Sequence, residues 1–248
     1  LWRPNNNKTL LSEYINFLKI NKLHKYNNYS KLHGWSIKNK TSFWKSIWDF
    51  TKTVGEYRGP VITNESDFIN SRFFINSKLN YFNNIIKNKS TGSAIVFYSE
   101  RGIKRELSWN QLEVDVNKFA NYLKKQGIKR GDRVGGVLPN IPETVVAFLS
   151  CSKIGAVWSS CSADFGPDAI IDRFNQIKPK ILIVSDYYYY NNKKIETLSK
   201  IKKIKKTIRS IKKVVIVSYI NISKKHKVKF AYDNWSSILS SYKELKEG

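Results

Sequence analysis

The sequence from Pro139 to Gly166 has the layout of one strand–helix–strand unit, and this layout limits what the chain can fold into. Pro142 falls in the first turn of the predicted helix, where its missing N–H would have no intrahelical partner anyway. Gly155 ends that helix, and residues 156–160 are predicted to form the next strand. Two strands joined by a helix are expected to pair in parallel, with a right-handed crossover.

The same alternation extends along the chain on both sides of this unit. Residues 94–98 and 105–107 are predicted to form a hairpin, and Ser108 followed by Gln111 has the spacing of a capping box, so a helix begins there and ends at Gly127. The further predicted strands are residues 133–138, 180–184 and 214–217, and the further predicted helices are residues 142–152, 167–176, 194–210 and 235–246. We therefore predict an α/β fold with a mostly parallel sheet.

The first 90 residues have a different character. Apolar side chains recur at helical spacing in residues 10–18 and again, with many aromatic rings, in residues 43–50. A short helix is predicted at residues 79–86, and residues 87–92 form a polar connector. We predict an α-rich cap over residues 1–90 and a second domain over residues 91–248.

The charge balance favours a solvated surface over a nucleic-acid site. Lys and Arg number 44 against 19 Asp and Glu, a net charge of +25, which by itself would suggest a polyanionic partner. The excess Lys is accompanied by Asn, Ile and Tyr throughout, and Arg, the better reader of bases, is much rarer than Lys. We expect no nucleic acid, and keep a basic nucleic-acid-binding module as the alternative from another class.

Targeting signals are not visible in the sequence. No stretch approaches the roughly 18 apolar residues that cross a bilayer, and residues 1–7 are polar. We expect no membrane partner and a cytoplasmic location. The chain contains no Met and starts at Leu1, so we also expect it to belong to a longer reading frame that continues beyond Gly248.

Few side chains have the pattern of a catalytic or metal site. Cys151 and Cys161 lie among apolar residues and are expected to be buried, and neither they nor the three His have metal-ligand spacing. A nucleophile at Cys161 or Ser160 would need a His base, for which His226 and His33 are the nearest in sequence, so turn chemistry is the favoured interpretation.

Two glycines and one acidic residue near the strand ends are expected to serve packing and helix capping rather than ligand binding. Gly135 and Gly136 are expected to allow close packing, and Asp164 is expected to cap the helix that follows it. No G-x-G-x-x-G loop and no Gly-rich loop followed by Lys occurs in the sequence, so no phosphate cradle can be assigned.

One strand end is the best candidate for binding an anion. Asp186 follows the predicted strand 180–184, and Lys193 precedes a predicted basic helix. Ligands bind at the carboxyl ends of parallel strands, and a helix N-terminus beside a Lys suits a phosphate. The alternative is that these lysines only form a solvated cationic face.

Several blocks together resemble the adenylate-forming acyl-CoA synthetases. The blocks are residues 29–37 and 43–50, residues 72–74 and 79–81, residues 99–102 and 105–109, residues 139–149, and residues 172–180. Trp158-Ser159-Ser160-Cys161-Ser162 resembles the acetoacetyl branch of that family more than the acetyl branch. The match covers nearly the whole chain.

The resemblance implies a function for a complete enzyme. Acetoacetate, ATP and CoA would give acetoacetyl-CoA, AMP and pyrophosphate through an acyl-adenylate, with Mg accompanying ATP. The phosphate loop, the ribose-binding Asp and the catalytic Lys of the family have no counterpart in residues 1–248, so no catalytic or metal-binding residue is assigned. The partners implied are these small molecules and the C-terminal remainder of the same protein. The alternative enzyme is an acetyl- or other short-chain acyl-CoA synthetase.

The resemblance also implies where CoA would be held. In acetyl-type relatives, two Arg beyond the strand that ends at Asp186 contact the phosphate end of CoA, and the matching positions are Tyr190 and Lys193. Lys193 keeps a positive charge and Tyr190 does not. The CoA contact is therefore expected to depend on Lys193 more than on Tyr190.

Overall fold

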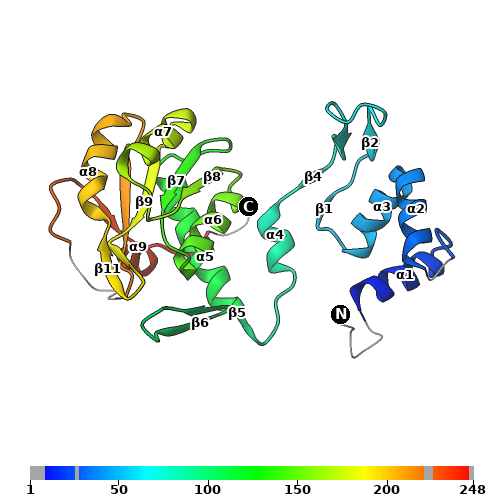
Figure 1. Cartoon of the computed structure of the whole chain (residues 1–248), viewed down its shortest axis with the longest axis horizontal. Coiled ribbons are helices and arrows are strands. Elements are labelled where there is room, and N and C mark those ends of the chain that lie inside the picture. Colours follow the sequence, from blue (N-terminus) through cyan, green and yellow to red (C-terminus); the bar gives the residue numbers. More distant parts are fainter. Residues whose placement is uncertain (1–8, 26–27, 221–225, 246–248) are drawn as a thin grey trace. The chain divides into compact units, whose positions relative to one another are not determined.

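A computed structural model describes residues 9–25, 28–220 and 226–245 of the chain (Figure 1). These residues fall into two compact units that divide between Leu79 and Asn80. We predicted a boundary near residue 90 between an α-rich cap and an adenylating domain. That boundary separates functional parts rather than compact units, so it stays a prediction.

The first unit is built on three short helices. They are α1 (Leu10–Ile20), α2 (Tyr29–Lys38) and α3 (Lys40–Phe50), so the helices predicted from the apolar stripes at 10–18 and 43–50 are confirmed. Thr9 and Ser12 form a capping box at the start of α1. Tyr14 and Leu18 are buried with Leu32, and the Tyr14 hydroxyl lies 2.6 Å from Ser46 Oγ.

Two small antiparallel ribbons complete the first unit. In one, β1 (Gly55–Glu56) pairs with β4 (Lys78–Leu79), and in the other, β2 (Ile62–Thr63) pairs with β3 (Arg72–Phe73). Each strand has only two residues, so side-chain packing rather than backbone pairing stabilises this segment.

The second unit opens with α4 (Tyr81–Ile86) and a hairpin of β5 (Ser93–Tyr98) and β6 (Lys104–Ser108). The helix α5 (Trp109–Lys125) follows directly, and Ser108 Oγ accepts a hydrogen bond of 3.1 Å from the Gln111 N–H, so the predicted helix start is confirmed. The Gln111 side chain donates to Asp115 Oδ1 at 2.7 Å, so the reciprocal half of the predicted capping box is replaced by this bond. Gly127 has a φ of +79° just beyond the helix, where a glycine is the residue with the least strain.

A five-stranded sheet forms the centre of the second unit. Its strands are β7 (Arg133–Val137), β8 (Val157–Cys161), β9 (Ile181–Ser185), β12 (Lys213–Val217) and β13 (Asp233–Asn234). The spatial order is β13-β12-β9-β7-β8, and every neighbouring pair is parallel. The predicted α/β fold with a mostly parallel sheet is confirmed.

The helices divide between the two faces of this sheet, because side chains alternate along each strand. Val215 and Ile183 join a core shared with α5, α6 (Pro142–Lys153) and α9 (Trp235–Ser241), whereas Val214 and Leu182 join a core shared with α7 (Pro167–Ile177) and α8 (Leu198–Thr207). Both layers are visible around the sheet in Figure 1. Central strands buried on both faces explain the continuous apolar runs in the sequence.

Gly135 and Gly136 on β7 allow close packing, as predicted. A Cβ on Gly136 would lie 2.5 Å from Cη2 of Trp158, and one on Gly135 would lie 3.3 Å from the ring of Phe174. Cys151 and Cys161 are buried, also as predicted.

Three predictions about helix ends are wrong. The helix predicted to begin at residue 194 begins at Leu198, because a second hairpin occupies the preceding residues. The last helix ends at Ser241, short of the predicted residue 246, since the backbone at Tyr242 is extended. Residues 243–245 then lie beside α5, where the Leu245 N–H donates to the carbonyl of Asn117. The helix α7 starts after Gly166 with no side-chain cap, so Asp164 does not cap it.

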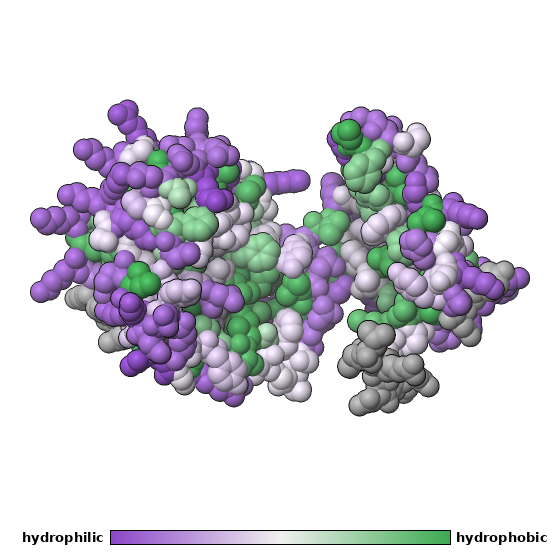
Figure 2. All heavy atoms as spheres, in the orientation of Figure 1, coloured by the Kyte–Doolittle hydropathy of each residue, from purple (hydrophilic) through white to green (hydrophobic). Residues whose placement is uncertain are grey.

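The surface carries the expected solvated lysines. Hydrophilic side chains project around α7 and α8 in the space-filling view (Figure 2), and Lys202, Lys203 and Lys206 on α8 are exposed. Within the described ranges, no helix is both long and apolar enough to cross a membrane.

Candidate functional site

The topology of the sheet identifies one edge as the place for a ligand. The chain leaves β7 toward β8 on one side and leaves β9 toward β12 on the other, so the carboxyl ends of β7 and β9 form a switch point. Ligands of open α/β sheets bind in the crevice outside such a point. Asp186, which directly follows β9, lies at this edge as the sequence predicted.

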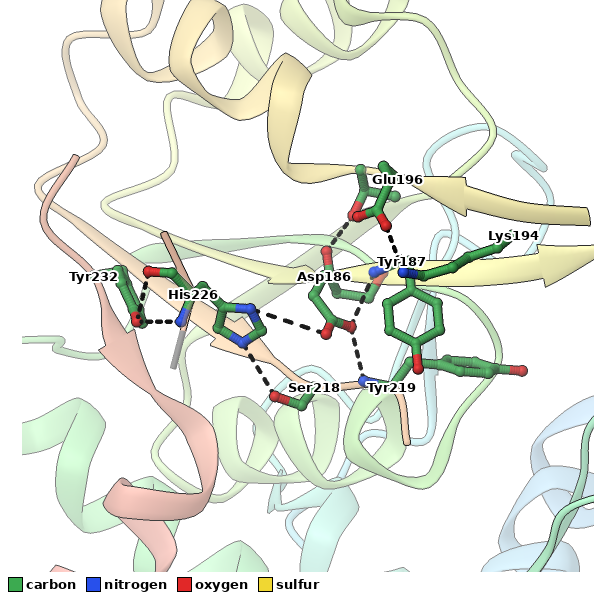
Figure 3. A network of polar contacts seen from close by, with 10 residues as sticks. Asp186, Tyr187, Lys194, Glu196, Ser218, Tyr219, His226 and Tyr232 are labelled. Carbon is green, nitrogen blue, oxygen red and sulfur yellow. Dashed lines mark hydrogen bonds and ion pairs between the residues drawn. The ribbon is translucent and has the colours of Figure 1, made fainter. Parts of the chain in front are cut away.

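Asp186 joins three segments at this edge. Its Oδ1 accepts hydrogen bonds of 2.9 Å from the N–H of Tyr187 and 2.9 Å from the N–H of Tyr219, and its own carbonyl accepts one from the Thr197 N–H (Figure 3). Only 2% of the residue is exposed. A buried carboxylate that accepts two backbone N–H bonds holds the ends of β9 and β12 and the segment after β9 in one arrangement.

His226 approaches Asp186 from a different segment. Its Nδ1 lies 3.9 Å from Asp186 Oδ2, and its Nε2 lies 3.1 Å from Ser218 Oγ (Figure 3). The main chain of His226 is fixed by the Tyr232 hydroxyl, which accepts from its N–H and donates to its carbonyl. The order Ser, His, Asp resembles a triad, but the 3.9 Å between His226 Nδ1 and Asp186 Oδ2 exceeds a hydrogen bond, so this geometry is not that of a catalytic triad.

The nucleophile considered at Cys161 or Ser160 is not supported by the geometry. Burial raises the pKa of the Cys161 thiol, the opposite of what a nucleophilic thiolate needs. The described contacts of the His226 ring lead to Ser218 and Asp186 instead. The turn interpretation of this strand end therefore holds.

A hairpin that the sequence did not predict carries the two candidate CoA residues. Strand β10 (Tyr187–Tyr190) pairs antiparallel with β11 (Lys193–Glu196), and Tyr190 lies opposite Lys193. Asn191 and Asn192 between them have φ values of 49° and 60°, the conformation of a two-residue hairpin turn that Asn tolerates. Lys193 is thus at a hairpin tip and not at a helix N-terminus, which corrects the expected setting.

The hairpin has two different faces. Tyr187 and Tyr189 point to one side, where both rings contact Tyr219, and Lys194 on the same side lies over the Tyr187 ring and pairs with Glu196 at 2.6 Å. Side chains alternate along a strand, so the other face carries the remaining residues, which are Tyr188, Tyr190, Lys193 and Ile195. Both tip residues are exposed, and Tyr190 is 67% exposed. The structure therefore brings the two candidate residues together on one face.

Two cavities flank the Asp186 network. One of about 560 Å³ is lined by Asp186, His226, residues of α8 and the segment 227–230. The other, of about 430 Å³, is lined by Ser218, by the Arg105–Glu143 ion pair, by polar side chains of α5 and by apolar side chains of α6 and α9. Ser218 and His226, which contact one another, thus separate two hollows at the ligand edge.

Within residues 9–25, 28–220 and 226–245, no three His, Cys, Asp or Glu side chains converge as ligands of a metal ion. The sequence likewise has no Gly-rich loop followed by Lys.

Comparison with known proteins agrees with this architecture. The sequence model of the family described as AMP-binding enzyme matches residues 86–242. Acetoacetyl-coenzyme A synthetase of Rhizobium meliloti (strain 1021) is 33% identical over 222 residues, which are 88% of this chain and 34% of the relative. Acetoacetyl-CoA synthetase of Xenopus tropicalis is 35% identical over 226 residues, 89% of this chain and 34% of the relative.

A solved structure has the same fold. Acetoacetyl-CoA synthetase from Streptomyces lividans aligns with a TM-score of 0.87 at 24% identity, covering 98% of this chain and 38% of that one. The chain spans about a third of the length of the curated relatives it matches. With the family model matching well over half of its residues, the chain belongs to the AMP-binding enzyme family.

Proposed function

We propose that this chain is the N-terminal part of an acetoacetate–CoA ligase. The complete protein would join acetoacetate to CoA, using MgATP and releasing AMP and pyrophosphate, in the cytoplasm. The observation that carries the proposal is the match to acetoacetyl-CoA synthetases over nearly nine tenths of the chain. The block Trp158–Ser162, which resembles the acetoacetyl branch, supports acetoacetate over acetate.

Residues of this chain would serve the second step of such a reaction, in which CoA reacts with the acyl-adenylate. Adenylation needs a loop that cradles the phosphates of ATP, and residues 1–248 contain no Gly-rich loop followed by Lys. The hairpin offers Lys193 as an exposed cation at the ligand edge of the sheet, where it would bind a phosphate of CoA. Tyr190, opposite Lys193, would contact the same part of CoA through its ring or hydroxyl.

The test is acid-dependent exchange of pyrophosphate into ATP by the complete protein. We expect acetoacetate to support exchange at a kcat/KM well above that of acetate, propionate or butyrate. A preference for acetate would instead assign the protein to the acetyl type. Absence of exchange with all four acids, together with nucleic-acid binding that falls steeply with salt, would support the basic-module alternative.

A further inference from the structure

Lys200 has an unusual environment for a lysine on a helix. It lies in the first turn of α8, where a cation opposes the helix dipole, and it is half-buried. Its Nζ leaves the helix and donates to the carbonyl of Ala163 at 2.5 Å and to that of Phe165 at 2.8 Å. Both carbonyls belong to loop 162–166, which connects the end of β8 to α7.

A carboxylate of loop 162–166, that of Asp164, interacts electrostatically with the ammonium group of Lys200. Burial lowers the pKa of Lys200, and the neighbouring Asp164 carboxylate opposes that change. Burial raises the pKa of Tyr188, and Asp164 adds to this increase. Ala163 of the loop and Tyr188 of β10 are both buried in the same hydrophobic core cluster. Lys200 hydrogen-bonds the loop to α8, which begins two residues after the hairpin ends.

Tyr188 identifies the face of the hairpin that the loop approaches. Tyr188 and Tyr190 are two residues apart on β10 and point to the same side, and Lys193 shares that side because it lies opposite Tyr190. The other face packs on Tyr219. Loop 162–166 thus lies beside the face that carries the two candidate CoA residues.

We propose that Lys200 is a positioning residue for the CoA site, which fixes loop 162–166 against the hairpin face bearing Tyr190 and Lys193. This assignment deepens the proposed function and rests on it for the identity of the ligand. Lys200 itself touches no substrate in this scheme. Two charge-assisted hydrogen bonds to carbonyls two residues apart in one loop are strong enough to select a single loop conformation.

The chain provides a matched control on the same helix. Lys203 Nζ lies 2.7 Å from Asp168 Oδ1 on α7, and both side chains are largely exposed. Lys203→Met therefore removes a lysine from α8 without touching loop 162–166. Lys200→Met removes the charge and both donors while keeping the length of the side chain, and Lys200→Arg keeps a positive charge.

Hydrogen exchange of the backbone amides measures the positioning directly. In Lys200→Met, we expect exchange in residues 162–166 and 187–196 to rise about tenfold, as for the loss of a charge-assisted bond, with Lys203→Met at the wild-type rate. Equal rates in the two variants would overturn the proposal. If Lys200→Met does not fold, Lys200→Gln, which also loses the charge, replaces it, and unchanged loop exchange there together with an unchanged KM for CoA would overturn the proposal equally. Lys200→Arg, which keeps a positive charge and N–H donors, should stay near the wild type in both measurements.

Kinetics of the complete protein separate positioning from general support of the fold. We expect Lys200→Met to raise the KM for CoA by about three- to tenfold while acid-dependent ATP–pyrophosphate exchange stays at the wild-type rate. An equal loss in both assays would assign Lys200 to the fold alone. Wild-type protein that shows no exchange with any acid would overturn the proposed function, whereas the hydrogen-exchange comparison would still decide whether Lys200 fixes the loop.

Discussion

The guanidinium of Arg105 on β6 holds both carboxylate oxygens of Glu143 in the first turn of α6, at 2.9 Å and 2.7 Å. The side chains are 26% and 17% exposed, so this bidentate pair is shielded from water far more than the lysine pairs of the surface. It connects the β5–β6 hairpin to a helix that covers the sheet.

Loss of this pair should destabilise the second unit. We expect Arg105→Gln to lower the free energy of unfolding by about 1–3 kcal/mol, because it leaves a poorly hydrated carboxylate without its partner. Urea denaturation followed by Trp fluorescence measures the change. Lys104→Gln, which breaks the exposed pair with Glu106 on the same strand, is the control and should leave the midpoint nearly unchanged. Equal midpoints for the two variants would contradict the expectation.

Gly136 should tolerate a side chain poorly. A Cβ there would lie 2.5 Å and 2.7 Å from two ring atoms of Trp158, so we expect Gly136→Ala to cost about 1–3 kcal/mol through overpacking. Gly34 on α2 has no heavy atom within 4 Å of such a Cβ, so Gly34→Ala should stabilise its helix by about 0.5–1 kcal/mol. Thermal unfolding of both variants compares the signs directly, and a destabilised Gly34→Ala would be inconsistent with this reasoning.

Asp132 should contribute to stability in a pH-dependent way. The hydrogen bond from Lys180, and after it the N–H of Lys129, lower the pKa of the Asp132 carboxyl in the folded state. A lowered folded-state pKa means that the contribution is complete above the unfolded-state pKa of about 3.9 and is lost as the pH falls through the folded-state value. The stability difference between wild type and Asp132→Asn should therefore be constant near neutral pH and shrink toward pH 2. A difference that grows on acidification would reverse the sign and refute the assignment.

Lys193 should matter for CoA and not for adenylation. Lys193→Ala removes an exposed charge, so we expect the KM for CoA of the complete protein to rise about two- to fivefold, with ATP–pyrophosphate exchange unchanged. Lys206→Ala, which removes an exposed lysine from the last turn of α8, is the control for general loss of charge. If both substitutions raise the KM equally, diffuse electrostatics explain the effect. If exchange falls as much as CoA use, Lys193 supports the fold.

The sheet was predictable from the sequence because its signals are local. Pro142 and Gly155 mark the ends of α6, Ser108 caps α5, and the buried strands are continuous apolar runs. Each of these signals depends on neighbours within a few residues, so one sequence suffices to detect them.

The hairpin was missed because its signal is ambiguous. Four consecutive Tyr in residues 187–190 show no alternation of apolar and polar residues, and the lysines that follow suit a helix better than a strand. The only local indication was the pair Asn191-Asn192, which can form a two-residue turn. Asp186 was identified at the strand end, whereas its link to His226 and the contacts of Lys200 join residues that are more than 30 positions apart, so no local pattern reveals them.

The attachment of the hairpin at Asp186 has a mechanical consequence. A four-residue strand is about 13 Å long, so the hairpin extends that far from the buried carboxylate of Asp186 to its tip at Lys193. If the hairpin rotated by roughly 5° about its attachment at Asp186, its tip would move by about 1 Å, which is enough to weaken a well-placed phosphate contact. Rigidity at the Asp186 end of the hairpin therefore sets how accurately Lys193 at its tip can meet a phosphate.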